Sequence, residues 1–147
     1  MKRSKSMIAY ACAAALLVVS GMANADALKY RKAVMKAIGG HMGSLGQIVK
    51  GGVPHKGHML AHAMALESTL DMVSDAFKTQ TSGGKTTATD KIWTDWKGFV
   101  AKANDASKAA NALVRTIEDD GDIAPAMKGV GKTCGGCHKA FRKKKKR

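Results

Sequence analysis

The segment Cys134-Gly135-Gly136-Cys137-His138, near the end of this 147-residue sequence, has the form C-x-x-C-H. This spacing is the attachment signature of a c-type haem. Two thiols three positions apart lie on one side of a helical turn, where each can form a thioether, and the adjacent imidazole can ligate the iron. A zinc site would need further ligands and a thioredoxin-like pair would need a βαβ context, and neither is present. We therefore predict that Cys134 and Cys137 hold one covalent haem c, with His138 as an iron ligand.

Residues 1–25 have the features of a secretory signal peptide. A basic start is followed by an apolar run over residues 7–19, too short to span a membrane, and by an A-x-A cleavage site at residues 23–25. We expect cleavage before Asp26, which also removes Cys12, and export to the periplasm; an uncleaved anchor is the alternative. In that oxidising compartment, haem attachment would keep the two remaining thiols from forming a disulfide.

The sequence is strongly basic. Three of its 25 Lys and Arg residues and none of its 11 Asp and Glu fall within residues 1–25, so the remaining 122 residues carry a net charge of +11. We expect residues 26–142 to form one cytochrome domain and residues 143–147 to be a basic, disordered tail. This charge favours redox partner proteins with an acidic surface, and anionic membrane headgroups are a second candidate partner. Nucleic acid is not expected as a partner after export.

Apolar residues recur at helical spacing throughout the domain, without period-two alternation. Four helices are predicted, over about 27–49, 56–78, 89–116 and 118–142. The acidic residues at 118–122 are assigned to the head of the fourth helix, where they would oppose the positive end of its dipole. Mostly short connections then predict an all-α, up-down-up-down antiparallel four-helix bundle with one covalently bound haem. The first and fourth helices would be neighbours on either side of the haem.

The predicted first helix has glycines in its interior, each of which costs about 1 kcal/mol relative to alanine. Its inward stripe is predicted to be Leu28, Met35, Ile38, Met42, Leu45 and Val49. Around the helix axis, Arg31, Met35, Gly39, Met42 and Gly46 lie within about 80° of one another. Spacing alone leaves two interpretations open: a recess that admits a macrocycle beside a thioether, or a kinked or closely packed helix with methionine as a gap-filler.

From Tyr30 to Arg142, the chain resembles the class II c-type cytochromes, the cytochrome c-prime family. The residues that carry the resemblance are Arg31-Lys-Ala-Val-Met35 and Met42-Gly43 in the first helix, and Cys134-Gly-Gly-Cys137-His138-Lys-Ala-Phe141-Arg142 near the end. Members of this family often dimerise through their first two helices, so the resemblance also implies a homodimer.

The resemblance implies that residue 35 lies over the distal face of the haem. Low-spin members have methionine there as the sixth iron ligand, whereas high-spin members have a residue that does not ligate. Met35 is therefore expected to ligate the iron opposite His138, with Met42, one heptad later, as the rival. The resemblance further implies that Arg31 contacts a haem propionate and that Arg142 lies near the proximal histidine.

These residues predict a periplasmic electron-transfer protein, because an iron held by His138 and Met35 changes little on reduction and has no open position. No Ser-His-Asp set, paired carboxylates or phosphate loop occurs, so an enzyme is not expected. The alternative is a protein that binds nitric oxide or carbon monoxide at an open or displaceable sixth position. A haem-free basic bundle that binds metal or lipid is a third hypothesis.

The histidines outside the motif are not expected to bind metal. His55, His58 and His62 lack a cysteine or clear carboxylate partner and are predicted to be exposed on a helix surface. His41 lies roughly 120° from Met35 around the first helix and should point away from the haem.

Overall fold

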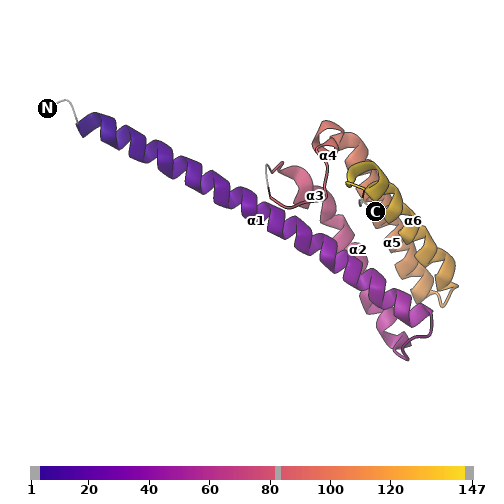
Figure 1. Cartoon of the computed structure of the whole chain (residues 1–147). Helices are drawn as coiled ribbons and strands as arrows, with labels where there is room; N and C mark the ends of the chain where they lie inside the picture. The colour runs from indigo at the N-terminus through magenta and orange to yellow at the C-terminus, as the bar shows by residue number, and fades with distance from the viewer. Residues whose placement is uncertain (1–3, 82–83, 145–147) are drawn as a thin grey trace.

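The computed structural model describes residues 4–81 and 84–144, with side chains from residue 25 onward. Figure 1 shows its helices, which are α1 (Ser4–Val49), the 3-10 helix η1 (Lys56–His58), α2 (Met59–Asp71), α3 (Val73–Lys78), α4 (Lys91–Thr94), α5 (Trp96–Glu118) and α6 (Ile123–Phe141). The described ranges contain no strand, and their one extended pairing is an isolated antiparallel bridge between Ala88 and Arg142. The prediction of an all-α four-helix bundle is confirmed.

The helices pack in a definite order. α2 packs against both α1 and α5, and α5 packs against α6, whereas α1 and α6 make few direct contacts with each other. Figure 1 shows α5 and α6 side by side, with α1 along the other side of the bundle. The bundle is therefore open along the edge between its first and last helices.

α1 begins well before the predicted start of the first helix at residue 27. It runs from Ser4 to Val49 without a break, and Figure 1 shows its amino-terminal part extending away from the bundle. A sequence rich in alanine and leucine favours helix, which accounts for the continuity. Cleavage after residue 25 stays a prediction. Among the described residues, no helix combines the length and the apolar character needed to cross a membrane.

Two predicted helices are each divided. The second begins with η1 and is interrupted at Met72, and the third is interrupted at Asp95. Asp95 leaves the helical conformation (φ −127°, ψ 53°), and its carboxylate accepts a hydrogen bond from the Gly98 N–H over 3.2 Å. This is an N-cap, in which aspartate satisfies a free N–H group at a helix start. The apolar residues keep helical spacing across Asp95, but the cap starts a new helix there and breaks the predicted third helix.

The assignment of the acidic run at 118–122 to the head of the last helix is mostly wrong. Glu118 ends α5, Asp119 caps its carboxyl end, and Asp120 adopts a left-handed conformation with φ 51°. Only Asp122 caps α6, accepting a hydrogen bond from the Ala124 N–H over 3.1 Å. The run forms a turn because aspartate bonds readily to its own backbone and tolerates positive φ.

The core follows the predicted seam of α5, where Phe99, Ala103, Ala106, Ala110 and Leu113 are all buried. The predicted stripe of α1 is confirmed at Ile38 and Leu45, which are buried. The rest of the buried stripe is Val34, Ile48 and Arg31, to one side of the predicted positions. Met35 and Met42 are only partly buried, and Val49 is exposed. α1 therefore packs on α2 with one stripe and presents its methionines to the open edge of the bundle.

Candidate cofactor-binding cavity

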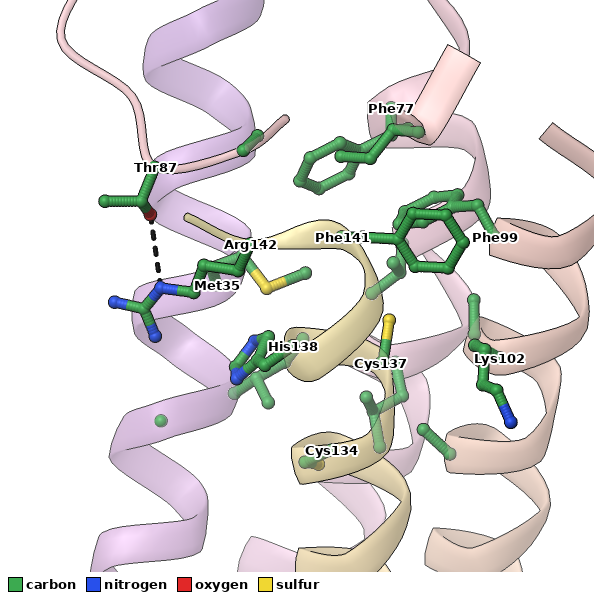
Figure 2. A pocket seen from close by; sticks show the side chains of 18 of the residues that line it. Met35, Phe77, Thr87, Phe99, Lys102, Cys134, Cys137, His138, Phe141 and Arg142 are labelled. Carbon is green, nitrogen blue, oxygen red and sulfur yellow. Dashed lines mark hydrogen bonds between the residues drawn. The ribbon is translucent and has the colours of Figure 1, made fainter. Parts of the chain in front are cut away.

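A cavity of about 490 Å³ lies between α1 and α6, at the edge where these helices make few contacts. This volume falls within the range of about 300–1,000 Å³ that is usual for ligand pockets. The predicted site residues that line it are Met35, Met42, Cys134, Cys137, His138 and Arg142. Figure 2 shows Met35 reaching from α1, and Cys137 and His138 from α6, toward the same space. The structure thus brings together the motif and the first-helix methionines, about a hundred residues apart.

α6 presents the motif on a regular helix. Cys134 and Cys137 are free thiols, both partly buried, and both line the cavity. A Cβ placed on Gly135 or Gly136 would have no heavy atom within 4 Å, so nothing crowds the turn between the thiols. The predicted position of both sulfurs on one side of a helical turn is therefore present.

The cavity disfavours the thiolate form of both cysteines in the haem-free chain. Burial raises the pKa of Cys134 and also that of Cys137, and the neighbouring Cys134 raises the pKa of Cys137 further. Lys102 of α5 acts in the opposite direction, because its positive charge favours the Cys137 thiolate. Figure 2 shows Lys102 on the same side of the cavity as Cys137.

His138 lines the cavity at its rim and is exposed to solvent. Partial desolvation by the cavity lowers its pKa, and the positive charge of Arg142 lowers it further. Both effects favour the neutral imidazole, which is the form that ligates a metal.

On α1, the glycines do not share one role. Gly39 lines the cavity between Met35 and Met42, and a Cβ there would meet nothing within 4 Å. Gly40, Gly43 and Gly46 do not line it. The recess interpretation therefore holds for Gly39 alone.

Arg31 does not line the cavity. It is 3% exposed, with its guanidinium carbon 5.2 Å from the ring centres of both Phe77 and Trp93, and its Nη2 donates a hydrogen bond to the Thr81 hydroxyl. Burial lowers its pKa. Its Nε and Nη1 are buried and have no hydrogen-bond partner among the described residues. This burial was not predictable from the sequence, since arginine is usually exposed.

Arg142 is exposed at the cavity rim and is held by the segment before α4. Its Nε donates to the Thr87 hydroxyl over 3.2 Å, which Figure 2 shows as a dashed line, and its backbone pairs with Ala88. The next residue, Lys143, donates its backbone N–H to the Thr87 carbonyl oxygen over 2.7 Å. Residues 143–147 stay a predicted tail, of which residues 145–147 lie outside the described residues.

Several cavity residues were missed from the sequence. Phe77, Phe99 and Phe141 form an aromatic wall, with Phe99 packed against both of the others at centroid distances of 5.2 and 5.4 Å. Their helical spacing predicted only a core. Thr87 and Ala88 belong to a polar connection whose sequence carries no sign of a site.

The remaining histidines divide into two pairs. His55 and His58 are exposed, as predicted. His62 is partly buried, so its predicted exposure is wrong; its Nδ1 lies 3.2 Å from Nδ1 of His41. His41 is absent from the cavity lining, as predicted.

The residues present fit a c-type haem. The cavity combines an apolar lining with two thiols, one imidazole and two thioethers, which are the kinds of attachment and ligand groups that this cofactor uses. The unpartnered nitrogens of Arg31, beside the cavity residue Phe77, are suited to an anionic group.

Comparisons with known proteins give consistent results. The family model described as Cytochrome C' matches residues 26–142. Cytochrome c' of Pararhodospirillum photometricum is 36% identical over 118 residues, 78% of this chain and 94% of that protein. Cytochrome c-556 of Agrobacterium fabrum is 35% identical over 125 residues, which are 82% of this chain and 84% of that protein. A solved nitric oxide complex of a mutant cytochrome c prime from Alcaligenes xylosoxidans has a TM-score of 0.73 and 31% identity, covering 83% of this chain and 97% of that one.

Proposed function

This chain belongs to the cytochrome c' family, whose proteins bind haem c, and we propose that it is a periplasmic electron-transfer protein with one covalently attached haem. The observation that carries the proposal is that Met35 of α1 and His138 of α6 line one cavity with two free thiols. When bound, haem supplies a one-electron iron couple.

The residues of the chain have separate roles in this proposal. Cys134 and Cys137 would attach the cofactor through thioethers, and the neutral imidazole of His138 and the sulfur of Met35 would be the ligands of its iron. The aromatic wall would exclude water from the site. Arg142, at the rim beside His138, would tune that ligand, and the nitrogens of Arg31 that have no partner among the described residues would pair with a haem propionate. No residue is assigned a catalytic role, so the protein is proposed to be a carrier and not an enzyme.

Cytochromes c' are typically high-spin, so the sixth ligand is the feature that distinguishes this proposal. The test is the absorption spectrum of the purified oxidised and reduced protein, including any sulfur-to-iron charge-transfer band. We expect a low-spin spectrum that becomes high-spin in Met35→Leu. Met42→Leu is the matched control, because Met42 lines the same cavity from the same helix and should leave the spectrum unchanged. A low-spin spectrum that persists in Met35→Leu would contradict the assignment.

A second candidate function is gas binding. The observation that favours it is the fold similarity to a cytochrome c prime solved as a nitric oxide complex. Addition of carbon monoxide to the reduced protein separates the two functions. A rapid and complete spectral shift would favour gas binding, whereas a spectrum that changes little supports the closed, Met35-ligated carrier.

The partner is proposed to be a redox protein with an acidic surface. Lys139, Arg142, Lys143 and Lys144 gather with His138 around a second hollow beside the cavity, at the edge where an electron would leave. Attraction to this surface predicts electron-transfer rates that fall as ionic strength rises. Peripheral contact with an anionic membrane and a homodimer are further proposals, tested by vesicle sedimentation and by sedimentation equilibrium of the purified protein.

A further inference from the structure

We propose a second metal-binding site, formed by His41 of α1 and His62 of α2 and separate from the cavity. The two Nδ1 atoms lie 3.2 Å apart, and the ring centres lie 5.5 Å apart with the planes inclined at 53°. Both side chains are partly buried, and neither lines the cavity. The close packing of α1 on α2 fixes the separation of the two rings.

The Nδ1 separation matches that of two ligands on one cation. Two imidazole nitrogens bound to zinc at the usual lengths, in tetrahedral positions, lie about 3.3–3.4 Å apart. In the absence of a cation, one Nδ1–H donates to the other Nδ1 at this distance. A cation takes both Nδ1 lone pairs, so the donor ring moves its proton to Nε2 and both imidazoles stay neutral.

The ligand chemistry selects a divalent transition-metal cation. Imidazole suits zinc, nickel and copper, and affinity among the divalent ions is greatest for Cu²⁺. In the described part of the chain, no group of three or more His, Cys, Asp or Glu residues could hold a metal ion. Water therefore fills the remaining positions, and the site is of the open, exchangeable kind.

His55 and His58 provide a matched control. Their rings are stacked, with centres 5.0 Å apart and planes inclined by only 8°. The lone pairs of an imidazole lie in the ring plane, so two parallel stacked rings do not direct them at one point. Like the proposed site, this control pair consists of two histidines in the first half of the chain, but its rings are not placed to chelate one cation.

The test is a titration of the purified, haem-loaded protein with Cu²⁺ alone. Calorimetry measures the affinity and stoichiometry, and electron paramagnetic resonance identifies the ligands. We expect one cation per chain, with hyperfine coupling to two nitrogens. His41→Gln and His62→Gln should each weaken Cu²⁺ binding by about 10²-fold. Each variant leaves one histidine, so the cation loses the second imidazole that the fold holds at high effective concentration beside the first. The double variant His55→Gln/His58→Gln should bind as the parent does.

Three outcomes would overturn the site. They are unchanged affinity in both His41→Gln and His62→Gln, an equal loss in the control variant, and a stoichiometry of one cation per two chains. The haem spectrum of each variant, recorded in the same samples, shows whether the fold is retained. Loss of the nitrogen coupling in either single variant then supports the site independently of affinity.

Discussion

The guanidinium carbon of Arg31 lies 5.2 Å from the centre of the Phe77 ring, and that ring also lines the cavity. The arginine is almost wholly buried, yet two of its nitrogens have no partner in the part of the chain that the structure describes. Each unsatisfied buried donor costs about 1–3 kcal/mol, whereas stacking on an aromatic ring returns about 0.5–2 kcal/mol. An anionic partner for these nitrogens, such as the haem propionate proposed above, would remove this cost.

Replacement of this arginine should destabilise the haem-loaded protein. Hydrogen bonds to charged groups are worth about 1.5–3 kcal/mol, so Arg31→Met should lower the unfolding free energy by about 2 kcal/mol. Urea unfolding followed by circular dichroism measures the change. Arg115→Met in α5 is the control, because Arg115 is exposed and its loss should have little effect. An increase in stability on replacing Arg31 would mean that its nitrogens are unpaired in the complete protein.

The double variant Cys134→Ala/Cys137→Ala should lose covalent haem entirely. Both thiols line the cavity, and no other free cysteine occurs in the described ranges with side chains. A haem stain after denaturing electrophoresis should be positive for the parent and negative for the variant, because only a thioether survives denaturation. Cys12 serves as the control position, since its replacement should leave the stain unchanged. A stain retained by the double variant would exclude thioether attachment at these residues.

The same haem-free variant should lose stability in mild acid. Burial and Arg142 lower the pKa of His138 below its ordinary value of 6.5, so the unfolded chain binds more protons than the folded one between that value and the lowered pKa. Stability is then complete above about pH 6.5 and falls as the pH decreases through this window. Urea unfolding across the pH range measures it. His138→Gln in the same background should flatten the profile, and an unaltered profile would assign the dependence to other groups.

The sequence predicted the features of this protein that depend on local pattern. The seam from Phe99 to Leu113 follows from helical periodicity, and the motif at Cys134 follows from spacing within one turn. Features that depend on contacts between distant segments were not predicted. Arg31 is buried because Phe77 and Trp93 enclose it, and neither is near it in sequence. The break at Asp95 was missed because periodicity continues across a residue whose capping propensity is stronger.

The connection before α4 shows the same limitation. Thr87 reaches the cavity through backbone pairing with residues beyond α6, a long-range contact that no local pattern encodes.

A hydrogen bond of Thr89 to the end of α6 can be tested by mutation. The Thr89 hydroxyl donates to the Phe141 carbonyl oxygen over 3.0 Å in a partly buried position. Thr89→Val keeps the shape of the side chain and should cost about 0.5–1.5 kcal/mol of unfolding free energy. Urea unfolding of the haem-loaded protein measures this loss.

Thr94→Val is the control for that variant. The Thr94 hydroxyl makes an exposed hydrogen bond of 3.5 Å to the Lys91 carbonyl oxygen, so its loss should change stability by no more than a few tenths of a kcal/mol. Equal effects of the two substitutions would show that the Thr89 hydroxyl does not hold the carboxyl end of α6 in place.

The last prediction concerns the reduction potential. Met35→His exchanges a thioether for an imidazole at the same position on α1. Because methionine raises the potential of a histidine-ligated haem relative to other axial ligands, the variant should stay low-spin but have a lower midpoint potential in a potentiometric titration. Met42→His is the control, since Met42 lines the same cavity one heptad later. If the potential falls in Met42→His and not in Met35→His, Met42 is the distal ligand. If neither substitution moves it, neither Met35 nor Met42 is the distal ligand.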